Sequence, residues 1–461
     1  MLKIYNTYSR EKEEFKAMEN TVKIYTCGPT VYNYAHIGNL RAYIFMDILR
    51  KTLKINGYKL NHVMNITDVG HLTSDADEGE DKMLKASREQ KLSPYEIAKI
   101  YTEKFLNDIS KLNIEEPEHI VKATDHIKEM EEYVKEIVKN GYGYETSKGV
   151  YFDTKKDVNY GELSKVKLED NLAGARIEVD REKRNSADFA IWIKAPENHI
   201  MKWESEFGLC YPGWHIECSA MGRKYLGNVM DIHTGGVDHI PIHHENEIAQ
   251  SRGCTGENPA KYWMHSEFLL IDGGKMSKSL GNVYTIKDLE DKGYTALDYR
   301  YLSYSSHYRN KLNFTWEGLE SAKIALNKLK LLYKAHTQSS DDIDESIIID
   351  YRDKFLNAIN DDLNIPMAMG VVWELSKLNK SNNIAKLLKE FDNILSLNID
   401  KIDELNKEMI NLPKEIEDIL EARKNARLNK NFEMSDVLRD ELLSKVYKVL
   451  DTKDGQQIEK I

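Results

Sequence analysis

A strand, a turn and a helix follow one another over residues 22–53, and this unit constrains the fold more than any other. Residues 22–25 (Val-Lys-Ile-Tyr) predict a buried strand, and apolar side chains recur at helical spacing over residues 40–53. A helix that begins after a glycine- and proline-containing turn points its backbone N–H groups and the positive end of its dipole at a bound anion. The unit therefore predicts an α/β fold with a phosphate site. The candidate phosphate contacts are His36, Gly38 and Asn39.

The first 120 residues continue this α/β pattern. Residues 59–68 predict a second strand that ends in the polar pair Thr67 and Asp68, and residues 83–112 are largely helical. Strands that alternate with helices form parallel sheets, whose ligands bind beyond the carboxyl ends of the strands. Thr67 lies at such an end, so we expect it near the phosphate site.

The length of 461 residues predicts about three domains of ordinary size. The expected fold class is α/β: a Rossmann-type parallel-sheet catalytic domain with an inserted subdomain, followed by a mostly α-helical C-terminal region. Turn-rich sequence after about residue 120 and later polar runs indicate the boundaries. The predicted parts are residues 1–120 and 201–305 as the halves of the catalytic domain, 121–200 as the insertion, 306–340 as a connecting region, 341–400 as a helical bundle and 401–461 as a small C-terminal unit.

Composition excludes several classes of protein. A net charge of −11 argues against non-specific binding of polyanions by the whole molecule. The N-terminus lacks a signal-peptide pattern, and no apolar run approaches the roughly 18 residues of a membrane span. Four cysteines in so long a chain favour free thiols over a disulfide framework. We therefore expect a cytoplasmic protein without a membrane segment.

Two stretches are nevertheless locally basic and are candidates for contact with nucleic acid, although a solvated helix face is the commoner explanation of either. The basic residues of the first are Arg309, Lys311, Lys323, Lys328, Lys330 and Lys334, and those of the second are Arg423, Lys424, Arg427 and Lys430.

A glycine-flanked loop at residues 272–282 places two lysines among small hydroxyl side chains, in the order Lys-Met-Ser-Lys-Ser at residues 275–279. Lysine supplies a point charge without a fixed geometry, which suits a pyrophosphate whose charge grows as it leaves. A lone pair of lysines at this spacing is more often a solvent-exposed loop. Together with the His-Ile-Gly-Asn turn, however, the loop resembles the two signature motifs, HIGH and KMSKS, of class I aminoacyl-tRNA synthetases. Its candidate phosphate contacts are Lys275, Ser277 and Lys278.

A second group of residues has the spacing of a metal site. His243 and Glu247 are four residues apart, so a helix that begins after Pro241 places them on one face. Cys218 and the strand-end Cys27 complete a set of two sulfurs, one nitrogen and one oxygen, which suits Zn²⁺. Buried cysteines are usually small hydrophobes, a His–Glu pair is usually a surface pair, and spacing alone leaves other ligands open. These are Cys210, His239 and His244.

Several stretches together resemble the cysteinyl-tRNA synthetase family, nearly collinearly over residues 1–320. They are residues 26–32, 65–68, 174–176, 183–185, 212–221, 243–251 and 262–265. The zinc ligands that the resemblance implies are Cys27, Cys218, His243 and Glu247, which leaves Cys210 and Cys254 as unassigned thiols. The cysteine pocket that it implies consists of Gly28, Thr67, Trp214, His233 and Asp238.

The chain departs from this family pattern in three places. Asn39 stands where many members carry the second histidine of HIGH, although its amide still donates a hydrogen bond. Val237 and His239 alter the segment before His243, and Gln456 lies where members often carry an aromatic residue. These departures concern the adenine and cysteine pockets and the anticodon contacts.

The resemblance implies ATP-dependent ligation of L-cysteine to tRNA(Cys) through a cysteinyl-adenylate, with one zinc ion per subunit and Mg²⁺ accompanying ATP. In this reaction His36 and Asn39 hold phosphates, and the two lysines of the loop stabilise the departing pyrophosphate. A metal with an open position binds a thiolate, whereas serine's hydroxyl ionises far less readily, so no editing domain is required. The resemblance also implies acceptor-stem contact by residues 306–340 and anticodon contact by residues 401–461, and we expect a monomer. Two alternatives stay open: a cysteine–amino-sugar ligase of the mycothiol type, and a non-enzymatic zinc- and nucleotide-binding module.

Overall fold

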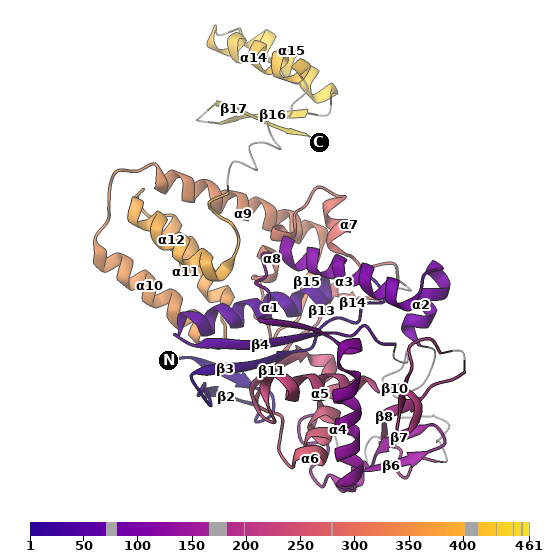
Figure 1. Ribbon diagram of the computed structural model, residues 1–461. Coiled ribbons are helices and arrows are strands. Elements are labelled where there is room, and N and C mark those ends of the chain that lie inside the picture. Colours follow the sequence, from indigo (N-terminus) through magenta and orange to yellow (C-terminus); the bar gives the residue numbers. More distant parts are fainter. Residues whose placement is uncertain are drawn as a thin grey trace. The chain divides into compact units, whose positions relative to one another are not determined.

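The computed structural model describes residues 1–70, 81–165, 182–197, 199–277, 280–401, 414–429, 431–445, 447–452 and 455–460. Within them the chain forms two compact units, Met1–Ile399 and Asp400–Ile461 (Figure 1). Among the described residues, none of the helices combines the length and the apolar character needed to cross a membrane.

A five-stranded parallel sheet forms the centre of the first unit. Its strands lie in the order β12-β11-β3-β4-β5, and every pair is parallel. Their bounds are β3 Thr21–Thr26, β4 Lys59–Ile66, β5 His119–Lys122, β11 Met230–Gly236 and β12 Ala260–Ser266. Of these five strands, β3 comes first in the chain and is central, later strands extend the sheet to either side, and the order reverses beside β3. This is the doubly wound arrangement that the alternating pattern predicts.

Helices cover both faces of this sheet (Figure 1). The helices on one face are α1 Ile37–Ile55, α2 Lys82–Gln90 and α3 Pro94–Lys111, and those on the other are α4 Ile127–Lys139, α5 Trp214–Leu226 and α6 His243–Thr255. Side chains of β3 alternate between two hydrophobic cores, with Val22 and Ile24 in one and Tyr25 in the other. Burial on both faces explains why apolar side chains occupy consecutive positions at Ile24 and Tyr25, although Lys23 interrupts the run.

The insertion lies between β5 and β11 in the chain and forms a separate antiparallel sheet. Its strands, in the order β6-β7-β8-β10-β9, are β6 Gly143–Thr146, β7 Gly149–Phe152, β8 Phe189–Lys194, β10 Gly208–Pro212 and β9 Trp203–Ser205. A short strand pair also opens the chain, β1 Lys3–Asn6 with β2 Glu11–Glu14. Because β10 leads directly into α5, the insertion and the catalytic sheet share a continuous piece of backbone.

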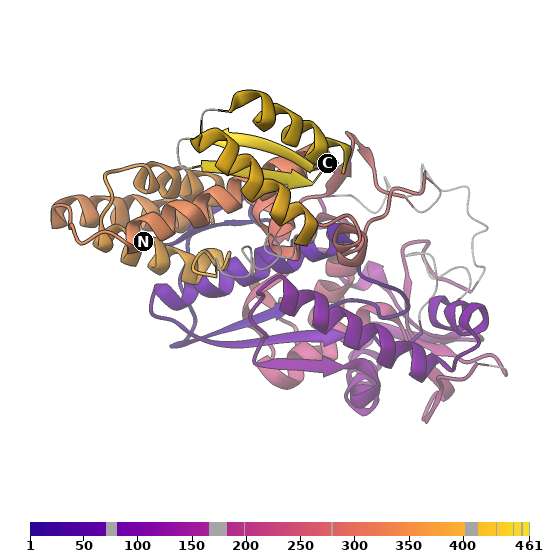
Figure 2. The same ribbon diagram turned by 90° about the horizontal axis from the view of Figure 1, so that it is seen from above.

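After β12 the first unit becomes mostly helical. A three-stranded sheet comprises β13 Leu269–Ile271, β14 Gly274–Lys275 and β15 Leu312–Phe314, with α7 Ile286–Glu290 and α8 Ala296–Ser303 between β14 and β15. The helices α9 Trp316–Thr337, α10 Glu345–Asn360, α11 Ile365–Ser376 and α12 Asn382–Leu395 lie together at one side of the unit (Figures 1 and 2). The predicted helical region is therefore confirmed.

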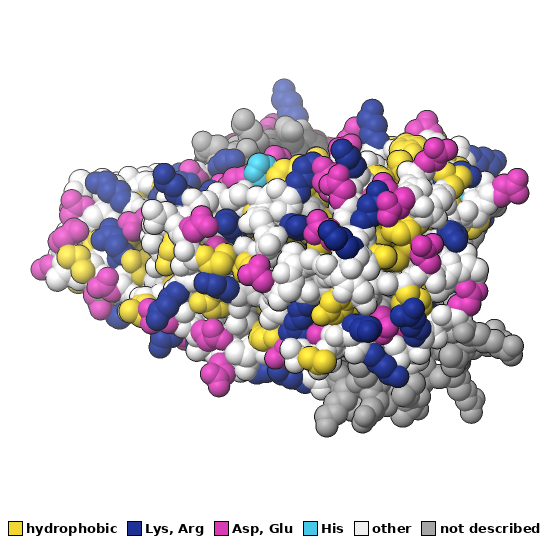
Figure 3. All heavy atoms as spheres, turned by 60° about the horizontal axis from the view of Figure 1, so that its bottom comes forward, with side chains coloured by type: hydrophobic (Ala, Val, Ile, Leu, Met, Phe, Trp, Pro, Cys, Tyr) yellow, Lys and Arg dark blue, Asp and Glu magenta, His cyan; other side chains and the backbone are white. Residues whose placement is uncertain are grey.

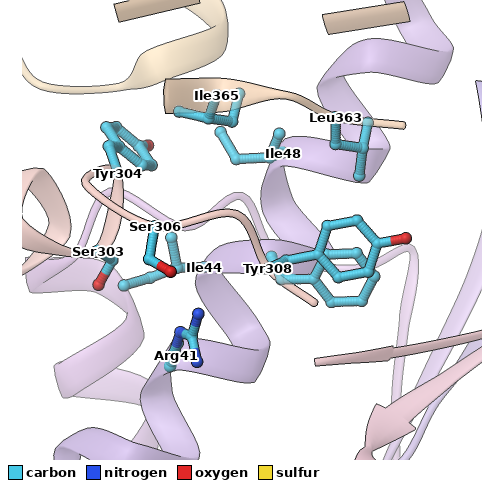
Figure 4. Close-up of a pocket in the computed structure, with 10 residues that line it drawn as sticks. Arg41, Ile44, Ile48, Ser303, Tyr304, Ser306, Tyr308, Leu363 and Ile365 are labelled. Carbon is cyan, nitrogen blue, oxygen red and sulfur yellow. The ribbon is translucent and has the colours of Figure 1, made fainter. Parts of the chain in front are cut away.

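A small cavity of about 30 Å³ lies where this helical region meets α1 (Figure 4). Arg41 lies at its edge and is 4% exposed, and its guanidinium donates to four backbone carbonyls, those of Glu267, Phe268, His307 and Asn310. Because Arg41 is fully occupied in joining these segments and the remaining lining is largely apolar, the cavity is a packing defect at a junction. None of the described candidate site residues lines it.

The second unit consists of α14 Lys414–Leu428, α15 Phe432–Ser444 and the hairpin β16 Tyr447–Thr452 with β17 Gly455–Lys460. The unit has its own small core, formed by Ile416, Ile419, Leu442, Tyr447 and Val449.

The basic stretches carry less surface charge than their sequences suggest. Arg423 on α14 is 1% exposed and donates to Oε1 of Gln456 at 2.8 Å, so the prediction that its charge faces a nucleic acid is wrong. Lys330 on α9 is 8% exposed, and Arg309 pairs with Asp362 at 2.7 Å. Long basic side chains often pack along apolar surface, and periodicity alone does not reveal it. On the face drawn in Figure 3, basic and acidic side chains are interspersed.

Candidate metal centre and active site

The turn between β3 and α1 places His36 at the N-cap of α1. Nδ1 of His36 accepts the backbone N–H of Asn39 at 3.1 Å, and Oδ1 of Asn39 accepts the backbone N–H of His36 at 3.2 Å. This capping box satisfies two helix-end donors reciprocally. With Nδ1 as the acceptor, the neutral ring of His36 carries its proton on Nε2, so it can donate to an anion. Asn39 therefore shapes the turn as well as offering its own amide.

The lysine-containing loop lies against this turn. A Cβ on Gly38 would lie 3.3 Å from the methyl carbon of Met276, so the two motifs pack closely together here. Asn282 closes the loop, because its Oδ1 accepts the N–H of Ser277 at 2.8 Å and its Nδ2 donates to the carbonyl of Lys275 at 3.2 Å. The Lys275 side chain is exposed, and Lys278 lies outside the described residues.

Three elements, β3, α5 and α6, bring the predicted metal ligands together near the carboxyl end of β3. Cys27 directly follows β3, Cys218 lies on α5, and His243 and Glu247 lie one turn apart at the start of α6. One ligand atom from each of the four falls within 4.8 Å of all the others, and all four residues are buried. Strand β3 therefore leads into both the candidate metal centre, through the thiol of Cys27 at its end, and the phosphate turn a few residues later.

A second group of four shares two of these residues. It consists of Cys27, His233, His244 and Glu247. Nε2 of His233 lies 2.8 Å from Oε2 of Glu247, and Nε2 of His244 lies 3.2 Å from Sγ of Cys27. Nδ1 of His215 lies 3.0 Å from Nδ1 of His243. Three of the four predicted ligands thus each contact an additional histidine.

The donor set fits a divalent cation. Oε1 of Glu247 is buried and lies 3.0 Å from Nε2 of His243, within ion-pair distance, but it has no aligned hydrogen-bond donor among the described residues. Buried carboxylate oxygens are rarely left unsatisfied. Two buried ligand atoms that face the same space are expected around a shared cation, and two sulfurs with one nitrogen and one oxygen suit Zn²⁺.

The electrostatics of the cluster favour cation binding. Burial opposes ionisation of Cys218, but hydrogen bonding with Cys27 and the charge of His243 outweigh it and lower the pKa of the thiol to about 6. Burial would also raise the pKa of Glu247, but His233 and His243 hold it well below its usual range. Burial would lower the pKa of His243, whereas Glu247 and Cys218 raise it to about 10. Burial, reinforced by Cys218 and Glu247, raises the pKa of the Cys27 thiol well above its usual range. Cys218 and Glu247 are therefore ionised at neutral pH, whereas Cys27 and His243 hold protons that a bound cation would displace.

A buried hydrogen-bond chain connects the two cysteine-bearing elements. The N–H of Gly28 donates to Oδ1 of Asn65 at 2.8 Å, and Nδ2 of Asn65 donates to Oγ1 of Thr67 at 3.0 Å. The Thr67 hydroxyl donates to Oε2 of Glu217 at 2.7 Å. Gly28 is required here, because a Cβ would lie 1.5 Å from the Asn65 carbonyl oxygen. Glu217 is fully buried beside Cys218, and sequence reasoning missed it because its helix face was unknown.

The remaining predicted pocket residues lie around the same cluster. Trp214, the first residue of α5, stacks on the ring of His243 at a centroid distance of 4.4 Å. His233 is fully buried on β11, whereas the side chain of Asp238 in the following turn is 61% exposed. Burial lowers the pKa of the neighbouring His239 to about 4, so this ring is neutral at physiological pH.

The two unassigned cysteines lie outside both groups of four. Cys210 is on β10 of the insertion, where its thiol donates to the carbonyl of Phe207. Cys254, near the end of α6, contacts Glu136 and Arg223 through its sulfur. All four cysteines of the chain are free thiols.

The doubly wound sheet, the phosphate turn and the lysine loop define the class of protein. A family model described as the tRNA synthetases class I (C) catalytic domain matches residues 14–324. Among solved structures, methionyl-tRNA synthetase of Mycobacterium tuberculosis in complex with methionyl-adenylate has the same fold. It superposes with a TM-score of 0.57 at 12% identity, over 82% of this chain and 90% of that chain. The catalytic core is thus that of a class I aminoacyl-tRNA synthetase.

Curated relatives define the family within that class. The cysteine–tRNA ligase of Treponema denticola is 45% identical, over 96% of each chain. That of Borreliella burgdorferi is 42% identical over the full length of both, and cysteine–tRNA ligase 1 of Burkholderia lata is 43% identical over 99% of this chain and 96% of its own. The chain belongs to the cysteine–tRNA ligase family.

Proposed function

We propose that the chain activates L-cysteine with ATP, giving cysteinyl-adenylate and pyrophosphate, and then transfers the cysteinyl group to tRNA(Cys) with release of AMP. One observation carries this proposal. The two thiols, the imidazole and the carboxylate of the candidate metal centre converge at the end of β3, and the same strand leads into the phosphate turn. A thiol-selective site and a triphosphate site on one turn are what adenylation of cysteine requires.

The phosphate contacts of the proposed mechanism come from the two motifs. His36 donates through Nε2 and Asn39 through its amide to the phosphates of ATP, at the positive end of the α1 dipole. Lys275 and Lys278 supply positive charge to the departing pyrophosphate, and Gly38 and Ser277 approach it through the backbone and a hydroxyl. Mg²⁺ accompanies the nucleotide.

The amino-acid site of the proposed mechanism lies around the metal centre. The residues that would hold zinc are Cys27, Cys218, His243 and Glu247. When bound there, Zn²⁺ supplies a Lewis acid that takes a substrate thiolate far more readily than a hydroxyl. Gly28, Thr67, Trp214, His233 and Asp238 form the pocket that orients the rest of the cysteine. Selection through one required contact can exceed about 10⁴-fold, which makes a separate editing domain unnecessary.

The remaining parts of the chain serve the tRNA in this proposal. The catalytic halves are residues 1–120 and 201–305, with residues 121–200 inserted between them. Residues 306–340 contact the acceptor stem, residues 341–400 form the helical bundle, and residues 401–461 read the anticodon. The protein acts in the cytoplasm, where thiols stay reduced, and acts as a monomer. The relatives support tRNA as the acceptor over an amino sugar. They are cysteine–tRNA ligases, and that of Borreliella burgdorferi aligns with this chain over the full length of both.

Cysteine-dependent exchange of pyrophosphate into ATP, measured together with zinc content, tests the proposal. Cys218→Ser replaces a candidate thiolate by a poor zinc ligand, so we expect loss of zinc and a fall in exchange of at least about 100-fold. Cys210→Ser is the matched control, because it removes another buried thiol outside the cluster. Exchange at the wild-type rate by a zinc-free Cys218→Ser protein would contradict the proposed metal site, and failure of the wild type to charge tRNA would contradict the function.

A further inference from the structure

A chain of hydrogen bonds runs from the N-terminal segment to the sulfur of Cys27. Oγ1 of Thr7 lies 2.8 Å from Nδ1 of His265, and Nε2 of His265 lies 2.7 Å from Nδ1 of His244. The opposite nitrogen of His244, Nε2, lies 3.2 Å from Sγ of Cys27. All four side chains are buried. Both imidazoles therefore use both ring nitrogens in this row of hydrogen bonds, which links β12 and α6 to the end of β3.

Binding of the cation proposed above would set the direction of donation along this chain of hydrogen bonds, because cysteine ligates a metal as the thiolate. Each neutral imidazole has one N–H donor and one nitrogen acceptor, so the chain can run in either direction. A thiolate has no proton to donate, so beside a thiolate His244 must donate through Nε2 and accept at Nδ1. His265 must then donate through Nε2 and accept at Nδ1, which makes the Thr7 hydroxyl the terminal donor. The Thr7 hydroxyl, which can donate or accept, completes the chain in this direction by donating to Nδ1 of His265.

Tight packing holds His244 in this orientation. Gly235 on β11 makes room for the ring, because a Cβ there would lie 2.7 Å from Cε1 of His244. Trp263 packs against the same ring at a centroid distance of 5.1 Å, and its backbone carbonyl accepts the N–H of Thr7 at 2.7 Å. The strand β12 therefore fixes both the ring and the terminal donor.

We propose that His244 is a positioning residue of the metal centre, and that Thr7 and His265 keep it as a hydrogen-bond donor to the sulfur of Cys27. This inference rests on the proposed zinc site. A donor to a ligand sulfur orients the thiolate and moderates its charge, and such outer partners typically account for about 10–100-fold in metal affinity.

The geometry favours this role over direct ligation by His244. Its Nε2 faces Sγ of Cys27 at hydrogen-bonding distance and lies 3.9 Å from Oε1 of Glu247. Nε2 of His243 lies 3.0 Å from the same carboxylate oxygen. His243 is thus the histidine closer to the carboxylate of Glu247, whereas the nearer of these two partners for His244 is the sulfur of Cys27.

Substitution of Thr7 tests the proposal in the full-length, zinc-loaded protein. Thr7→Val removes the terminal donor with almost no change in volume. We expect the zinc dissociation constant, measured without substrates by competition with a chromophoric chelator, to rise about tenfold. In the Co²⁺-substituted protein the sulfur-to-cobalt charge-transfer band should shift without losing intensity, because both thiolates stay bound. Thr7→Ser, which keeps the hydroxyl, should restore both properties.

Two further variants make the result decisive. Thr52→Val removes a buried hydroxyl on α1 that has no hydrogen-bond partner within the described part of the chain, and it should leave zinc affinity unchanged. His265→Phe interrupts the row of hydrogen bonds one step nearer the sulfur. It tests the positioning role of His244 if Thr7→Val proves unstable in thermal unfolding of the metal-free protein. Wild-type zinc affinity and an unshifted band in His265→Phe would overturn the positioning role.

Failure of the underlying metal site is distinguishable from failure of this inference. A wild-type protein that binds no zinc would overturn the proposed function's metal centre. Zinc that is retained by Cys218→Ser but lost by His244→Phe would make His244 a ligand of the alternative group, and so would overturn the positioning role alone.

Discussion

At the scale of single residues, Asp108 is a buried carboxyl outside the candidate site. It lies on α3 and is 9% exposed. Burial, which Glu290 reinforces and Lys111 opposes, raises its pKa from 3.8 to about 6. The folded state holds the proton of Asp108 more tightly than the unfolded state does. The protonated carboxyl therefore stabilises the fold, and its ionisation removes that stabilisation. Its stabilising contribution is fully present below about pH 4 and is lost as the pH rises through about 6.

Asp108→Asn should therefore stabilise the protein at high pH only. We expect the free energy of unfolding to increase by about 1–2 kcal/mol at pH 8, a value reduced from the full effect of the pKa shift because the group is partly solvated. At pH 3, below the ordinary value of 3.8, the variant and the wild type should differ little. Urea unfolding at the two pH values measures this. An equal difference at both would show that the ionisation of Asp108 does not matter to stability.

At the scale of elements, a buried ion pair fastens α1 to the helical region. Asp47 of α1 accepts hydrogen bonds from Arg300 of α8, from Lys51 and from the backbone N–H of Glu115. Both Asp47 and Arg300 are fully buried, and Arg300 also donates to the carbonyls of Leu112 and Leu395. The helix whose first turn carries the phosphate motif is thus held by residues from three other segments.

Removal of one member of this pair leaves an uncompensated buried charge. We expect Asp47→Ala to lower the free energy of unfolding by about 3–5 kcal/mol, measured by urea denaturation. Asp350→Ala is the matched control, because Asp350 forms an exposed pair with Lys354 on α10 and such pairs contribute about 0.5 kcal/mol or less. Similar losses in the two variants would contradict the structural role of the buried pair.

At the scale of the whole molecule, the chain divides into two units with separate cores. The two large hydrophobic cores contain only residues up to Ile399, and the core of the second unit starts at Ile416. The candidate metal centre and the phosphate turn lie in the first unit. Adenylation and tRNA recognition should therefore be separable.

A chain truncated after Ile399 tests this separation. We expect it to fold, to bind zinc and to catalyse cysteine-dependent pyrophosphate exchange near the wild-type rate, because no described core residue of the first unit is removed. The efficiency of tRNA charging should fall by more than about tenfold, equivalent to about 1.4 kcal/mol of lost binding free energy. Undiminished charging would contradict the role proposed for the second unit.

The sequence predicted the doubly wound sheet, the insertion and the helical bundle. It could do so because strands buried on both faces, amphipathic helices and turn residues each carry a local signature. It also predicted four metal ligands through the helical spacing of His243 and Glu247 and a family resemblance, and their role stays a proposal. The burial of Arg423 and the contact between Glu217 and Thr67 were not predictable. Both depend on which faces of distant elements meet.

The surroundings of Cys27 show which features the sequence determines and which depend on tertiary structure. Sequence alone determined that Cys27 follows a strand and precedes a phosphate turn, since both are neighbours in the chain. Only the tertiary structure decided that His244 contacts the sulfur and that Thr7 ends the chain of donors. A helix period assigns side chains to faces, but the packing of α6 and β12 beside β3 chooses which face meets the thiol.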